Sequence, residues 1–140
     1  MTVTDPEAPV HLAGKRSREA AIAHDKQAWL DNFADDAVVE DPIGPSHFDP
    51  DGTGHRGKDA IAKFFDMAIA PSALEFHFDK TYVCGQEEAN VGHIVIVASG
   101  YRHPRPAARQ IRALILARAL ARRTLRIARA ATGPGSSANP

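Results

Sequence analysis

The apolar positions in the first half of the chain repeat at helical spacing. Residues 10–24 are rich in Ala and other good helix formers, which predicts a first helix. Residues 26–33 place their large apolar side chains on one face and predict a second, short helix. Residues 58–70 repeat apolar side chains at i, i+1, i+4 and i+5, and Pro71 follows, so a third helix should end there.

The pattern then changes to that of strands. Residues 37–41 read as a short strand, because Pro42 disfavours helical geometry in the residue before it. Residues 43–57 are rich in Gly and Pro and predict a long loop, a kind of segment that is often functional. Residues 74–78 alternate apolar and polar side chains, and residues 91–98 are an apolar run with β-branched members. The two predict a pair of neighbouring strands.

Helices followed by antiparallel strands predict an α+β fold in which three N-terminal helices cover a curved antiparallel sheet. The C-terminal segment does not fit this plan. Residues 102–129 are rich in Arg and Ala and have high helix propensity, but their apolar side chains scatter around a helical wheel. We therefore expect a domain over 1–101 with a truncated sheet, and a helical or disordered tail over 102–140. The composition of residues 133–140 predicts disorder.

Length and composition indicate one domain that can bury a core, since the chain has 140 residues and 44% are hydrophobic. Cys84 is the single cysteine, which excludes an internal disulfide framework. The sequence has no apolar run long enough to span a bilayer, and residues 1–14 lack the pattern of a signal peptide. We expect a cytoplasmic protein that does not enter a membrane.

The net charge of zero conceals an uneven distribution. All 17 acidic residues precede residue 101, whereas residues 101–140 contain nine Arg and no Asp or Glu. One hypothesis is that the segment after about residue 102 is an out-of-frame reading of a GC-rich gene, which would produce Arg, Ala, Pro and Gly. The alternative is a genuine basic extension that binds polyanions in a salt-dependent way. We favour the first, so a nucleic-acid partner is not expected.

Two segments carry a resemblance to a known family. Residues 33–44 read FADDAVVEDPIG, and residues 57–65 read GKDAIAKFF. Together they resemble the ketosteroid isomerase (steroid delta-isomerase) family of the nuclear-transport-factor-2-like superfamily, which also contains polyketide cyclases. The resemblance covers about residues 10–101. It implies a cone-shaped fold with three helices on a strongly curved sheet and an apolar pocket at the wide end.

The resemblance implies that Asp41, the Asp before Pro, is the general base of a double-bond isomerisation in a 3-ketosteroid or similar polycyclic ketone. Proton transfer at carbon needs such a base and donors for the developing oxyanion. Because core residues of a cone can also line its pocket, we expect Trp29, Phe33 and Phe65 to contact the ligand. His93, in a predicted strand, is a further candidate for this lining. No metal and no organic cofactor are expected.

The chain departs from the family at the oxyanion donors. The family's tyrosine on the first helix, 24 residues before the base, is Ser17 here. The family's second donor, an Asp on a later strand, has no counterpart, because residues 101–140 contain no acidic residue. Activity is therefore expected to be low, and the alternative is a non-catalytic protein that binds a small apolar ligand. The family's homodimer uses later strands, so the sequence argues against it here.

The long loop contains two of the seven histidines, His47 and His55. A structural role is the favoured interpretation for both, with contact to a ligand or metal as the alternative.

Overall fold

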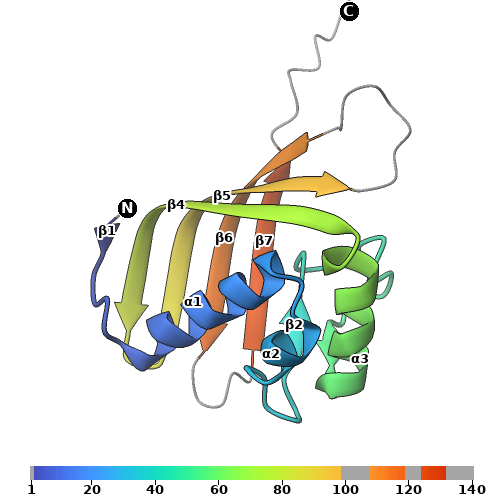
Figure 1. Ribbon diagram of the computed structural model, residues 1–140, viewed down its shortest axis with the longest axis horizontal. Helices are drawn as coiled ribbons and strands as arrows, with labels where there is room; N and C mark the ends of the chain where they lie inside the picture. The colour runs from blue at the N-terminus through green and yellow to red at the C-terminus, as the bar shows by residue number, and fades with distance from the viewer. Residues whose placement is uncertain (1, 99–107, 119–123, 132–140) are drawn as a thin grey trace, which may run out of the picture.

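The computed structural model describes residues 2–98, 108–118 and 124–131, and it confirms the α+β fold class. Three helices lie along one side of a curved sheet (Figure 1). The elements in chain order are β1 (Thr2–Val3), α1 (Pro9–Ile22), α2 (Lys26–Leu30), β2 (Val38–Glu40), β3 (His55–Arg56), α3 (Gly57–Phe64), the π-helical turn η1 (Phe65–Ile69), β4 (Ser72–Cys84), β5 (Glu87–Ala98), β6 (Ala108–Arg118) and β7 (Thr124–Ala131).

The seven strands form one sheet in the order β1-β4-β5-β6-β7-β2-β3. β4 through β7 pair antiparallel in succession. β2 pairs with β7 in parallel, with Val38 opposite Thr124, and with β3 antiparallel, with Val39 opposite His55. The short strands β2 and β3 are thereby attached at one end of the sheet, next to the last strand of the chain, while β4 lies near the other end.

The predicted curvature has a local cause in β4 and β5. The register shifts between Phe78 and Lys80, which is a β-bulge, and bulges bend a strand and increase its twist. Gly92 pairs with Phe78 at this point, and a Cβ on Gly92 would collide with the His77 carbonyl oxygen. The two backbones can therefore approach this closely only because residue 92 is glycine.

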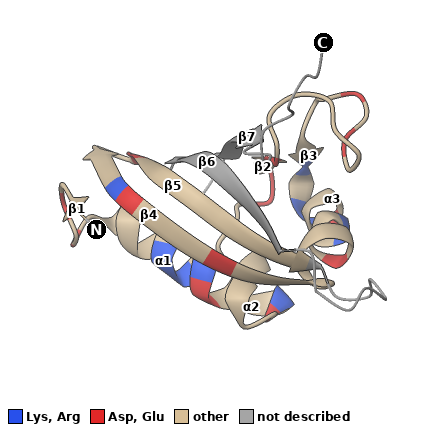
Figure 2. Cartoon of the chain, turned by 90° about the horizontal axis from the view of Figure 1, so that it is seen from above, with Lys and Arg blue, Asp and Glu red and all other residues tan. Residues whose placement is uncertain are grey.

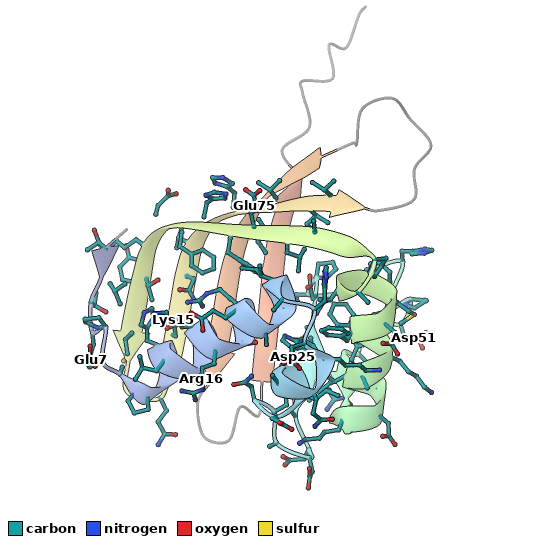
Figure 3. All side chains as sticks on the ribbon, viewed as in Figure 1. Glu7, Lys15, Arg16, Asp25, Asp51 and Glu75 are labelled. Carbon is teal, nitrogen blue, oxygen red and sulfur yellow. The ribbon has the colours of Figure 1, made fainter. Side chains whose placement is uncertain are left out.

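Alternation along β4 defines two faces of the sheet. Ser72 and Thr81 are buried, and Phe76 is half-buried opposite the buried Ile94 of β5. Glu75 is exposed, and Figure 3 shows it on the side of β4 away from α1. The face that carries Phe76 and Ile94 is therefore the inner face, which the helices cover.

The main core lies between the helices and β2. Trp29, Val39, Ile61 and Phe64 are 4% exposed or less and belong to one buried cluster. The predicted third helix is present as α3 and continues into η1, where the amide of Ala70 donates to the carbonyl oxygen of residue 65. The predicted second helix is shorter than expected. Its N-cap is residue 25, whose side chain accepts a hydrogen bond from the amide of residue 28.

The expectation of a truncated sheet with a helical tail is wrong where the structure describes the tail. Residues 108–118 and 124–131 are strands β6 and β7, and they join the sheet beyond β5. Without β6, the long strand β5 would leave a row of unpaired backbone groups at an open edge. Pairing with this edge overrides the local helix propensity of the Arg and Ala residues. The predicted disorder of residues 133–140 lies outside the described residues.

A buried polar network ties α1 to β4 and β5. The Glu88 side chain is fully buried, and its carboxylate accepts from His11 Nδ1 at 2.7 Å and from Asn90 Nδ2 at 2.7 Å. Arg18 Nη1 lies 3.6 Å from the same carboxylate, and Thr81 Oγ1 donates to Asn90 Oδ1 at 2.6 Å. Burial lowers the pKa of the Arg18 guanidinium, while the charge of Glu88 opposes this shift. Each carboxylate oxygen thus has a donor.

Candidate functional site

Asp41 directly follows β2 at the point where this strand meets the core. Val39 is fully buried, and alternation places Asp41 on the same face, where it is 8% exposed. Glu40 lies on the opposite face, together with Val38. A Cβ added to Gly54 would lie 2.8 Å from Val38 Cγ1 and 3.0 Å from Glu40 Cγ, so both side chains point to the same side of the strand. Asp41 is therefore a buried carboxylate on the core side of the strand, and Glu40 is not.

Three of the residues predicted to contact a ligand form one aromatic group. The ring centroid of Trp29 lies 4.8 Å from that of Phe33 and 5.3 Å from that of Phe65. All three side chains are buried, and they share a core cluster with Val39, the residue two positions before Asp41. The structure thus brings these three predicted residues together beside β2.

Phe64 extends this aromatic group toward the long loop. Its ring lies 6.5 Å from Trp29 and 6.1 Å from Phe48, the latter at an interplanar angle of 88°. The ring of His55 lies 4.6 Å from that of Phe64 at 35°. The loop between β2 and β3 therefore contributes an aromatic ring, and β3 contributes an imidazole, to the aromatic group that α2, α3 and η1 build.

The long loop is held by its own hydrogen bonds. Ser46 and Asp49 exchange two backbone hydrogen bonds, of 2.8 and 3.2 Å. Asp49 is buried, and its Oδ2 accepts from the amide of Gly54 at 2.8 Å, which closes the loop just before β3. Asp51 is exposed and lies at the outer edge of the loop, beside α3 and away from the sheet (Figure 3).

His93 does not join this group. It pairs with His77 across β4 and β5, and the two rings stack at 4.8 Å and 16°. His77 Nε2 in turn lies 3.0 Å from Glu75 Oε2, on the outer face of the sheet. The inner face of β5 at this point is occupied by Ile94 instead. The strand prediction was right for this segment, but alternation puts His93 on the opposite side of the sheet from Asp41.

Two polar residues of the loop region stand out only in the structure. The side-chain atoms His55 Nε2 and Ser46 Oγ are shielded from solvent and have no hydrogen-bond partner among the described residues. The sequence placed both in a loop and gave no sign of their burial. Ser17, at the position of the family's tyrosine, is 5% exposed on the buried face of α1. A serine hydroxyl at this position is shorter than a phenol.

Other kinds of site find little support in the described part of the chain. Nowhere in residues 2–98, 108–118 and 124–131 do three or more His, Cys, Asp or Glu side chains come together as metal ligands. Within the same ranges no helix is long and apolar enough to cross a membrane. Charged side chains of both signs are present along α1 and β4 (Figure 2). Mixed faces of this kind are typical of a solvated surface.

Comparisons with known proteins agree with the sequence resemblance. A family model described as SnoaL-like domain matches residues 15–130. A Δ5-3-ketosteroid isomerase from Mycobacterium sp. is 34% identical, with a TM-score of 0.73 over 86% of this chain and 92% of that chain. Rv0760c from Mycobacterium tuberculosis, in complex with estradiol-17β-hemisuccinate, is 31% identical, with a TM-score of 0.75 over 86% and 93%. No curated protein matches the chain.

The matched range also corrects the extent of the resemblance. It was expected to end near residue 101, but the family model continues to residue 130 and includes β6 and all of β7 except its last residue. A SnoaL-like polyketide cyclase from Shewanella putrefaciens, at 14% identity and a TM-score of 0.69, shares the fold alone.

Proposed function

The chain belongs to the SnoaL-like domain family, and on this premise we propose that it is a steroid delta-isomerase-like protein with Asp41 as the general base. The substrate would be a 3-ketosteroid or a similar apolar polycyclic ketone. Asp41 would remove a proton from the carbon between the ketone and the double bond. It would return that proton to the far carbon of the original double bond, so that the double bond moves into conjugation with the ketone and no atom is gained or lost.

The burial of Asp41 is the observation that carries this proposal. Asp41 is 8% exposed at the end of a strand whose preceding core residue, Val39, packs in the same cluster as Trp29 and Phe65. A carboxylate next to aromatic side chains can meet an apolar ring system while water is excluded. The 34% identity to a ketosteroid isomerase supports the same chemistry.

The oxyanion is the weak point of the catalytic proposal. Removing the proton leaves a dienolate, and one preorganised hydrogen-bond donor to such an oxygen is typically worth about 3–4 kcal/mol of the barrier. The resemblance assigns this task to the position of Ser17, whose hydroxyl reaches less far than a phenol. We therefore expect turnover well below that of an enzyme that has the tyrosine.

The departure at Ser17 favours a second candidate, a protein that binds a steroid-like ligand without converting it. The complex of Rv0760c with estradiol-17β-hemisuccinate supports binding of this ligand class in a 31% identical chain. In such a protein Asp41 would contact a polar group of the ligand and transfer no proton. Binding alone needs no donor that strengthens in a transition state.

The test is a proton-transfer assay with a β,γ-unsaturated 3-ketosteroid, in which ultraviolet absorbance reports the conjugated product. The variant is Asp41→Asn, and the matched control is Asp51→Asn, which makes the same chemical change at an exposed position of the adjoining loop. Turnover that Asp41→Asn abolishes and Asp51→Asn preserves would support the isomerase.

Titration of estradiol by calorimetry decides the remaining case. A folded chain that binds estradiol but converts no ketosteroid would support the carrier. A folded chain that neither binds nor converts any steroid would refute both candidates.

A further inference from the structure

His55 lies in β3, and Asp41 directly follows the neighbouring strand β2 on the same face. His55 pairs with Val39 across β3 and β2, and cross-strand partners in an antiparallel pair project to the same side. Asp41 follows Val39 by two residues and therefore shares that side. His55 and Asp41 are diagonal neighbours, a relation in which Cβ atoms are roughly 7–8 Å apart or somewhat less. Both residues are 8% exposed. One bound molecule can reach both.

The imidazole of His55 is fixed on one side and lacks a partner on the other. Its ring packs on Phe64 at 4.6 Å. Its Nε2 is shielded from solvent and has no hydrogen-bond partner within the described residues. Buried polar side-chain atoms in folded proteins are mostly hydrogen-bonded, because an unmade bond costs free energy. A bound molecule that offers a hydrogen-bonding group would satisfy a nitrogen in this state.

The surroundings of His55 indicate the kind of partner. Phe64 connects it to Trp29 on one side and Phe48 on the other. Aromatic walls with a few fixed polar groups are typical of sites for small, mostly apolar molecules. A single imidazole nitrogen in such a wall suits one oxygen on a ring system. It can donate to a ketone or accept from a hydroxyl, depending on its tautomer.

We propose that His55 Nε2 forms a hydrogen bond with an oxygen of the bound ring ligand, beside Asp41. This inference rests on the proposed binding of a steroid-like molecule. His55 thereby fixes the orientation of the ligand. From β3 it gives the ligand a hydrogen-bonding group, whereas Ser17 on α1 offers only a short hydroxyl.

The experiment measures affinity by calorimetry for three ligands: estradiol, its 3-deoxy analogue and its 17-deoxy analogue. His55→Phe keeps an aromatic ring against Phe64 and removes Nε2. His55→Gln retains a polar group as a rescue variant. His47→Phe is the matched control, because His47 is an exposed histidine of the same loop and its ring touches Phe48 rather than Phe64.

We expect His55→Phe to weaken binding of estradiol and of one deoxy analogue about tenfold, which corresponds to about 1.4 kcal/mol. The analogue that lacks the contacted oxygen should bind wild type and His55→Phe within about twofold. His55→Gln should recover part of the loss, and His47→Phe should change none of the three affinities. An equal change for all three ligands, or no change, would overturn the inference.

Two outcomes separate this inference from the proposed function. If the wild-type chain binds none of the three ligands, the proposed function fails and the inference fails with it. If wild type binds them and His55→Phe does not discriminate among them, only the inference fails. Should His55→Phe not fold, the 15N shift of His55 Nε2 in labelled wild-type protein is the measurement. A shift unchanged by saturating estradiol would also overturn the inference.

Discussion

Replacing Glu88 tests the buried network that joins α1 to the sheet. Its side chain is fully buried, and its two oxygens accept from His11 Nδ1 and Asn90 Nδ2, both at 2.7 Å, with Arg18 Nη1 at 3.6 Å. Glu88→Ala removes every one of these acceptors at once. It leaves two buried donors and a largely buried guanidinium without a counter-charge, which is the costly kind of change.

The structure also fixes what Glu88→Gln should do. Thr81 Oγ1 donates to Asn90 Oδ1, so the amide nitrogen of Asn90 must face residue 88. A glutamine can accept this bond with its carbonyl oxygen, and its NH2 then faces His11 Nδ1, which accepts in the other tautomer. Glu88→Gln therefore loses mainly the charge opposite the guanidinium, at about 1–2 kcal/mol, whereas Glu88→Ala should cost about 3–5 kcal/mol.

Urea unfolding followed by circular dichroism measures both values, provided that the transition is two-state. The matched control is Glu87→Gln, the same chemical change at the adjacent exposed position, and it should cost less than about 1 kcal/mol. If Glu88→Ala proves no more destabilising than Glu87→Gln, the network contributes nothing to stability and the reasoning is refuted. If the two Glu88 variants cost the same, the argument from the Asn90 orientation is wrong.

Three further predictions concern the core, the loop and the C-terminal segment. Ile61→Ala should lower the free energy of unfolding by about 2–5 kcal/mol, because Ile61 is fully buried. Met67→Ala, at a residue that is 48% exposed, should change it by less than about 0.5 kcal/mol. Equal losses of stability in urea unfolding would contradict the assignment of Ile61 to the core. Gly54→Ala should destabilise the fold more than Gly85→Ala. Both glycines have a positive φ, which costs an alanine about 1–2 kcal/mol. Of the two positions, only Gly54 would also bring the new Cβ into collision with neighbouring side chains. The family match through residue 130 and the pairing of β6 and β7 with β5 weigh against the out-of-frame hypothesis for residues 102–140, so we expect no shifted frame of the coding DNA to restore a regular alternation of apolar and polar residues, and sequencing that finds such a frame would contradict this expectation.

The helices and the β4–β5 pair were predictable because their signals are local. The apolar stripe around Ile61 has helical period, and the alternation around Phe76 has the period of a strand, so neighbouring residues alone specify the element. Strands β6 and β7 were missed for the opposite reason. Their Arg and Ala residues favour a helix locally, and only pairing with β5 selects the extended form. That pairing is a property of the assembled sheet, which no local window contains.

The predicted site residues likewise include some that local sequence signals indicated and one, His93, whose placement depends on the assembled sheet. Asp41, Trp29, Phe33 and Phe65 were chosen from motif and apolar pattern, and the structure gathers the three aromatic residues into one group beside the strand that leads to Asp41. The prediction for His93 required knowing which face of β5 points inward. That is set by the pairing with β4 and by the helices above it, and it could not be taken from the alternation alone.

Whether the chain is an enzyme or a carrier depends on how the ligand oxygen is held. In the proposed reaction the proton leaves a carbon bonded to the carbonyl carbon, so the base and the oxygen donor must act on a carbon and an oxygen that are both attached to that carbonyl carbon. Under the proposal Asp41 and His55 would meet this requirement together, because the register of β2 and β3 puts them diagonally across one face and both are buried. A hydrogen bond that is equally strong for the ketone and the dienolate lowers the dissociation constant and leaves kcat unchanged. Only a donor that binds the charged oxygen more tightly accelerates proton transfer, and a dry aromatic wall strengthens such a difference because it lacks the dielectric screening of water. The burial of His55 against Phe64 is thus what would allow a chain without the family's tyrosine to retain some catalysis.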